Sequence, residues 1–230
     1  MQCVWRMKRP AGQRVAVAFA SLLSAFASNG HASQGKKSSA IDPAAKPVSN
    51  YEDVGYQFSI ALDHLAQKYT TPIGLDLEIP VERESVSVRV PRGTVADILN
   101  AIIAQEPGYK WAQVNGVLIV MPEVNPNSIV GLQIAHFHVR NADLFGIHTA
   151  IVSLPEVKKW LEQNHLTERT AFAFDMLVGK DGYNPPRVSL NLRNVTLRDI
   201  MNEIVRRPGF HSWSVGRWGE KNQYFGIAVD

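Results

Sequence analysis

His136 and His138 lie two positions apart in a segment, 129–139, that we predict to be a strand. Successive side chains of a strand point to opposite faces, so both imidazoles are expected on one face. Two imidazoles on one face can begin a metal site, but such a site needs at least one further ligand. The spacing of His148 and His165 brings neither of them to this face. We therefore expect ordinary strand histidines, no bound metal and no cofactor.

Four acids lie closest to the ends of predicted strands: Glu82, Glu84, Asp175 and Asp181. A glycosidase needs two carboxylates at a set separation, and nothing in the spacing pairs these four. The chain also lacks a G-x-S-x-G elbow, a P-loop and a G-x-G-x-x-G turn. We predict no catalytic residue and a protein that is not an enzyme. A secreted hydrolase built from His136, His138 and an acid stays open as a third hypothesis.

An internal repeat organises the part of the chain that would position these residues. The segments 86–90 and 94–100 recur as 188–192 and 196–202, at an offset of 102 that also relates Trp111 to Trp213. Self-similarity at a fixed offset indicates a repeated architecture. The repeated positions are mainly those that a fold needs, which weighs against an active site within them.

Each repeat reads as the same series of elements. An alternating strand is followed by Thr94-x-x-Asp97 or Thr196-x-x-Asp199, which is typical of a capping box at a helix start. A Pro-Gly stop and a hairpin follow, the first with an Asn115-Gly116 turn. Ahead of this unit we predict a helix that begins near Ser59 and a strand over 73–79. In the second unit, the corresponding predictions are a helix over 145–164, broken at Pro155, and a strand over 171–177.

These elements predict an α+β fold of two repeated small domains, each with two helices packed on a mixed β-sheet. The first domain is expected over 51–123 and the second over 129–230. Residues 122–127 have two prolines and two asparagines and read as a linker.

Residues 1–32 are predicted to be a signal peptide. Arg6, Lys8, Arg9 and Arg14 precede a short apolar run and an A-x-A site at 25–27. The run is shorter than a membrane span, so no stable span is expected after cleavage, and the protein is expected to be periplasmic or extracellular. Removing the four positive charges of the leader from the net +3 leaves −1, which argues against nucleic acid as a partner. The one cysteine, Cys3, lies in the leader. Residues 33–50 read as a flexible linker.

The repeated residues resemble the short N-terminal domain shared by bacterial secretins and TonB-dependent receptors, the STN domain. The matching pattern is a strand pair, Thr-apolar-x-Asp-Ile-Leu/Met, a helix that ends at Gly, aromatic-x-Trp and a closing hairpin. It covers 58–121 and, in a more divergent form, 139–229. The resemblance implies a non-enzymatic α+β module of the periplasm or outer envelope that docks other proteins. Nothing after Asp230 forms a barrel or ring, so a free-standing adaptor is expected rather than a pore.

Five residues are predicted to contact a partner. Trp218 lies near a hairpin tip, on the face opposite to that of Trp213 and Arg217, and Tyr224 lies on the return strand. The run 117–121 is apolar on both faces, so either the second domain or a partner covers it. The predicted partner residues are Trp218, Arg217, Tyr224, Leu118 and Val120.

The leading hypothesis from the sequence is an exported adaptor that docks an envelope protein, linked to a secretion or TonB system. The alternative is a periplasmic module that binds a small ligand or a cell-wall glycan between the two domains.

Overall fold

The computed structural model of the protein describes residues 42–78, 85–125, 127–169, 185–219, 221 and 223–229. Residues Ala40–Asp230 form one compact unit. Its N-terminal half contains η1 (Pro43–Ala45), β1 (Pro47–Tyr56), α1 (Phe58–Tyr69), β2 (Ile73–Leu77), β3 (Val86–Thr94), α2 (Val95–Ile103), β4 (Tyr109–Val114) and β5 (Val117–Pro122). Its C-terminal half contains η2 (Ile129–Gly131), β6 (Gln133–Ala142), α3 (Leu144–Val152), α4 (Pro155–Gln163), β7 (Thr167–Glu168), β8 (Val188–Thr196), α6 (Leu197–Val205), β9 (Ser212–Trp218) and β10 (Tyr224–Val229).

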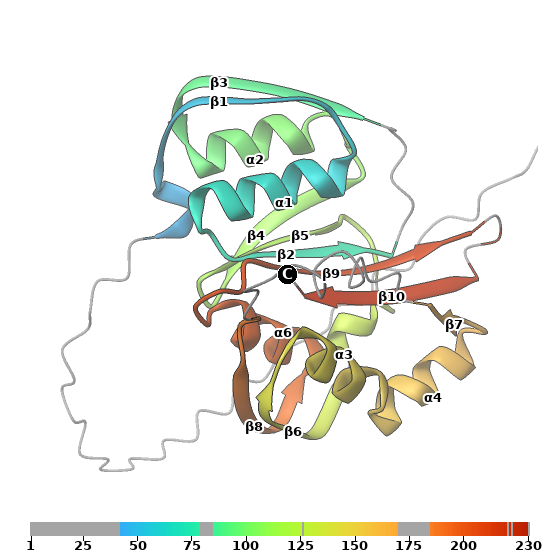
Figure 1. Ribbon diagram of the computed structural model, residues 1–230. Helices are drawn as coiled ribbons and strands as arrows, with labels where there is room; N and C mark the ends of the chain where they lie inside the picture. Colours follow the sequence, from blue (N-terminus) through green and yellow to red (C-terminus); the bar gives the residue numbers. More distant parts are fainter. Residues whose placement is uncertain are drawn as a thin grey trace, which may run out of the picture. The chain divides into compact units, whose positions relative to one another are not determined.

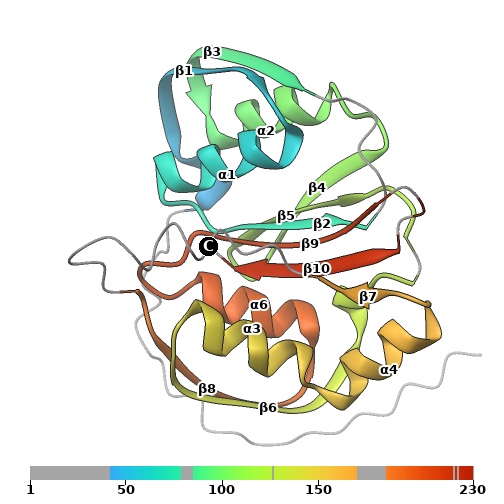
Figure 2. The same ribbon diagram turned by 45° about the vertical axis from the view of Figure 1, so that its right-hand side comes forward.

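The elements of this unit form layers on both sides of a central sheet. In the N-terminal half, the antiparallel ribbon β1–β3 arches over α1 and α2, and in the C-terminal half the ribbon β6–β8 arches over α3 and α6 (Figure 1). The rotated view shows the helices of the two halves on opposite faces of the sheet (Figure 2). The mixed helix and sheet content agrees with the α+β prediction.

The central sheet joins the two halves. Its strand order is β4-β5-β2-β9-β10-β7, so that β2 of the first half pairs in parallel with β9 of the second. Each half contributes three strands in the same order, but the directions are reversed, because β9 runs parallel to β2 and antiparallel to β10. The orientations of the two halves are thus related by a rotation of 180° about an axis that lies in the plane of the sheet and is perpendicular to its strands. Since they share one sheet, the prediction of two separate small domains is not confirmed.

Strand β5 shows why the run 117–121 is apolar on both faces. Leu118 and Val120 pack in the hydrophobic core of the N-terminal half, whereas Val117 and Ile119 pack against the C-terminal half. Strand β5 also lies between β4 and β2, so it is not an edge strand. The covering element is therefore the second half of the same chain, which was one of the two predicted possibilities.

Several local predictions are confirmed. Thr94 and Thr196 each close a capping box with the acid three residues on, Asp97 or Asp199. Positive φ values of 52° and 80° at Asn115 and Gly116 make the predicted tight turn. The predicted break at Pro155 separates α3 from α4.

Three predicted positions differ from the structure. The strand expected over 129–139 begins only at Gln133, because residues 129–131 form η2, and it runs to Ala142. The linker expected over 33–50 overlaps β1, which begins at Pro47 and already buries Val48 in the core. Helix α1 begins at Phe58, close to the predicted start, but its N-cap is Gln57 and not Ser59. The signal peptide, the first part of the linker and the strand predicted over 171–177 lie outside the described residues. Within the described ranges, no helix is long and apolar enough to cross a membrane.

Candidate functional site

A cluster of buried polar side chains lies where the two halves meet. Asp76 on β2 and Glu78 just after it are almost fully buried. The hydroxyl Oγ of Ser128, which precedes η2, lies 2.7 Å from Asp76 Oδ2 and 2.7 Å from Glu78 Oε1. The backbone N–H of Ile129 also donates to Glu78 Oε1 at 2.7 Å. This cluster links the N-terminal half to the first residues of the C-terminal half.

Arg217 on β9 provides the positive charge of this cluster. Its guanidinium donates to Glu78 Oε2 at 2.9 Å, and its Cζ lies 5.2 Å from the ring centroid of Trp160 on α4. Burial raises the pKa of both Asp76 and Glu78, while the hydrogen bond from Ser128 and the charge of Arg217 act in the opposite direction. Removing a carboxyl group from water disfavours its charged form, so the cluster favours one neutral acid.

The hydrogen atoms of the cluster indicate which acid holds the proton. The Ser128 hydroxyl has one hydrogen, so it donates to one carboxyl group and must accept from the other. Glu78 already accepts from Ile129 and Arg217, which stabilises its charged form. We therefore expect the proton on Asp76, with the donors running from Asp76 through Ser128 to Glu78. This arrangement is a buried structural junction, and an open hollow of about 390 Å³ adjoins it at Ser128 and Trp160.

The sequence gives only a weak signal for this cluster. Asp76 and Glu78 alternate with apolar residues in the strand predicted over 73–79, which is typical of a half-solvated strand. Their burial depends on the C-terminal half covering that face, and the spacing within one strand does not predict such cover.

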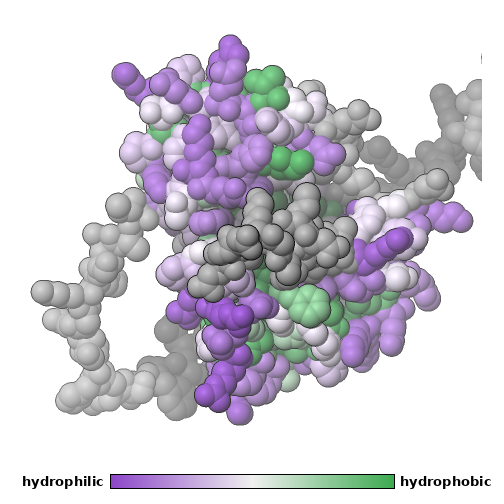
Figure 3. Space-filling model, viewed as in Figure 1, coloured by the Kyte–Doolittle hydropathy of each residue, from purple (hydrophilic) through white to green (hydrophobic). Residues whose placement is uncertain are grey.

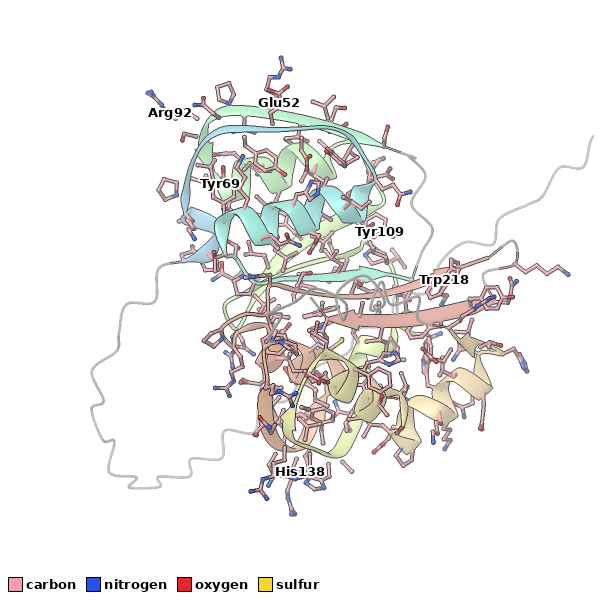
Figure 4. The ribbon with its side chains drawn as sticks, in the orientation of Figure 1. Glu52, Tyr69, Arg92, Tyr109, His138 and Trp218 are labelled. Carbon is pink, nitrogen blue, oxygen red and sulfur yellow. The ribbon has the colours of Figure 1, made fainter. Side chains whose placement is uncertain are left out.

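The structure separates the five predicted partner residues into three groups. Leu118 and Val120 are fully buried in the core, so they offer no surface to a partner. Arg217 is engaged by Glu78 and Trp160, on the same face as Trp213 as predicted. Trp218, with 37 % of its surface exposed, and the half-buried Tyr224 lie opposite each other on β9 and β10 (Figure 4).

A groove of about 490 Å³ lies beside Trp218. Its walls come from the first turn of α1 and from β2, and its floor from β9 and β10. Gly216 and Gly226 face each other across that floor, and Ser214 faces Ala228. The side chains of the floor are small: Ser214, Gly216 and Ala228 are half-buried, whereas Gly226 is buried.

The same face of the N-terminal half is closed. Aligning the hairpins by Trp111–Val120 and Trp213–Val229 matches Val117 to Gly226 and Ile119 to Ala228. Val117 and Ile119 are fully buried under the C-terminal half. The groove therefore occupies the position at which the first half binds the second.

The predicted metal candidates do not gather. His136 and His138 stack with ring centroids 6.3 Å apart, and His136 Nε2 lies 2.8 Å from Asn191 Oδ1. They project from the ribbon β6–β8, as the label of His138 shows (Figure 4). His148 instead lies 3.2 Å from Glu168, and burial lowers its pKa. The described part of the chain contains no group of three His, Cys, Asp or Glu side chains able to hold a metal.

The four acids considered as catalytic candidates, Glu82, Glu84, Asp175 and Asp181, lie outside the described residues. The surface over β6 and β8, at the lower left of the view, is hydrophilic (Figure 3).

Comparison of the chain with protein-family models, with curated proteins and with solved structures finds no match in any of the three.

Proposed function

We propose that this chain is an exported, non-catalytic docking protein of the cell envelope, whose protein partner binds in the groove beside Trp218. The observation that carries the proposal is the correspondence between this groove and the face of the N-terminal half that the C-terminal half covers. In the N-terminal half, this face of the sheet packs against the C-terminal half. In the C-terminal half, the corresponding face is lined by small residues and bordered by the exposed Trp218.

The residues around the groove suit protein recognition. Trp and Tyr are enriched among the residues that dominate binding energy, and Trp218 and Tyr224 form a cross-strand pair at its end. Two further exposed apolar side chains, Tyr56 and Ile60, flank the wall residues Gln57 and Ser59 in sequence. A partner that lays apolar side chains over the half-buried Gly216 and Ala228 would exclude water from this floor.

Export and an envelope location rest on the predicted signal peptide and on the resemblance to the secretin/TonB domain. Export and the envelope location are therefore part of the proposal. A secretion or TonB-linked outer-membrane assembly is the partner class that this resemblance favours.

Site-specific crosslinking in cells tests the groove. A photo-reactive amino acid at Tyr224 should give one discrete adduct with the partner. Trp218→Ala should abolish that adduct, because it removes the aromatic side chain that borders the groove. Gly216→Val should abolish it too, by filling the floor. A Cβ at Gly216 meets only Leu77, at 3.7 and 3.8 Å, which is ordinary contact, so this variant should fold.

Phe145→Ala is the matched control, because Phe145 is the more exposed aromatic at 57 % and lies on α3. The adduct should persist in this variant. Adduct formation that survives both Trp218→Ala and Gly216→Val, or that Phe145→Ala reduces equally, would show that the partner does not use the groove.

A further inference from the structure

A buried polar trio lies between β1 and α1, away from the groove residues. Asp53 on β1 is only 7 % exposed, and both of its carboxylate oxygens lie 3.1–3.2 Å from Nδ1 of His64 on α1. The hydroxyl of Tyr51 lies 3.2 Å from Asp53 Oδ2 and 3.3 Å from the carbonyl oxygen of Ala61. An acid buried beneath an arch of two strands is costly unless it is paired.

The C-terminal half shows that the fold does not require this trio. The ribbons align by their registers: Tyr51 pairs with Val90 as Phe137 pairs with Leu192, and Asp53 pairs with Val88 as Val139 pairs with Leu190. His64 is the seventh residue of α1, and Ala150 is the seventh of α3. Phe, Val and Ala thus build the same contact without a polar group. The fold therefore does not need polar residues at these three positions, and such exceptions usually serve function.

The hydrogen bonds fix how His64 is presented. A charged Asp53 only accepts hydrogen bonds, so Nδ1 of His64 carries the hydrogen that points to it. Nε2 lies on the far side of the ring, and 40 % of the His64 side chain is exposed. Tyr56 holds the ring edge-on, with centroids 4.6 Å apart and planes at 78°. A carboxylate that orients a histidine in this way leaves Nε2 ready to accept a hydrogen bond.

A hollow of about 450 Å³ adjoins this histidine. Its described lining is Tyr51, Glu52, Asp53, His64, Gln67 and Lys68. Lys68 is the one lysine or arginine of that lining, and its Nζ lies 5.1 Å from the ring centroid of Tyr51. Glu52 points outward from the ribbon, where its carboxylate meets Arg89 at 2.5 Å (Figure 4). The volume suits a ligand of monosaccharide size.

We propose that this hollow binds a small hydroxylated carboxylate of the sugar-acid class. A ligand hydroxyl donates to His64 Nε2, and the ligand carboxylate pairs with the Lys68 ammonium. Gln67 Nε2 donates to Asp63 Oδ2 at 2.7 Å, so the Gln67 amide oxygen accepts from a second ligand hydroxyl. Asp53 is a positioning residue that sets the His64 ring, and Tyr51 supports Asp53. This site is separate from the docking groove, and Tyr56 is the one residue named in both.

The test uses the full-length chain and follows the His64 ring signals by NMR. D-Glucuronic acid and N-acetylmuramic acid are the probes, and D-glucose is the neutral control. Both acids should shift the His64 signals in a saturable way, and glucose should bind about tenfold more weakly because it lacks the carboxylate. Lys68→Gln should remove that preference. His64 signals that neither acid moves would overturn the proposal.

A triple variant separates binding from folding. Tyr51→Phe with Asp53→Val and His64→Ala gives the first half the residues of the second. It should melt at the same temperature as the parent or higher, and it should lose binding of both acids as measured by calorimetry. A large loss of stability would show that the trio is architectural, and retained binding would show that the acids bind elsewhere. Either result would overturn the proposal.

Discussion

The indole Nε1 of Trp213 donates a hydrogen bond to Asn202 Oδ1 at 2.8 Å. At an offset of 102 residues, Trp111 makes the same bond to Asn100, also at 2.8 Å. In each half, this bond fastens the first strand of the closing hairpin to the helix that packs on it. The environments differ, because Trp213 and Asn202 are buried whereas Trp111 is half-buried and Asn100 is exposed.

Asn202→Ala should destabilise the protein more than Asn100→Ala. The first change leaves a buried indole N–H without an acceptor, which costs about 1–3 kcal/mol. The second leaves an N–H that water can reach, so the expected cost is below about 1 kcal/mol. Urea unfolding of both variants gives the comparison. Equal losses would mean that burial does not control the strength of this contact.

Gly74 on β2 lies directly opposite Trp213 on β9, where the two halves join. A Cβ at this position would lie 2.3 Å from Cε2 of the indole, which is far inside van der Waals contact. Gly74→Ala should therefore lower the free energy of unfolding by about 1–3 kcal/mol or more. Gly108→Ala is the control, since nothing lies within 4 Å of a Cβ there. A Gly74→Ala protein as stable as the control would contradict the tight contact between the halves.

The local elements of this fold could be predicted from the sequence because their signals are local. The Thr-x-x-Asp boxes, the Asn115-Gly116 turn and Pro155 each act within a few residues of the chain. The alternating strand 86–90 likewise shows its own buried face. Because the sequence repeats, the same local signals predict the corresponding elements in both halves.

The joining of the halves could not be predicted in this way. Pairing of β2 with β9 brings together residues about 140 positions apart, and no local pattern encodes that register. The doubly apolar strand β5 indicated only that something covers it. For the same reason the pattern did not show that the second half, rather than a partner, covers strand β5.

Both capping boxes should contribute to stability by similar amounts. Thr94→Ala and Thr196→Ala each remove the oxygen that accepts from the N–H of Asp97 or Asp199, at 3.3 and 3.1 Å. The expected cost is about 1 kcal/mol in each variant. Thr149→Ala, at an exposed position inside α3, should be neutral or slightly stabilising because alanine is the better helix former. Thermal unfolding monitored by circular dichroism distinguishes the three, and a cost at Thr149 as large as at the caps would reject the capping explanation.

The proton shared at the junction makes stability depend on pH. Burial raises the pKa of Asp76, against the opposing effects of Ser128, Arg198 and Arg217. Between the ordinary aspartate pKa of about 3.9 and the raised folded value, the folded state binds more protons than the unfolded state. Stability from this group is therefore complete below that window and is lost as pH rises through it. Glu78, whose pKa burial also raises, adds to the same trend.

Asp76→Asn should flatten this dependence, because an amide keeps a neutral donor toward Ser128 at every pH. Its free energy of unfolding should match the parent at the acid end of a pH series and exceed it at the alkaline end. Glu78→Gln is the contrasting variant, since it leaves Arg217 without its carboxylate and should cost about 3 kcal/mol throughout. Urea unfolding across this pH range measures both. A parent protein whose stability rises with pH in the window, or an Asp76→Asn protein with the parent's slope, would show that Asp76 is charged in the folded state.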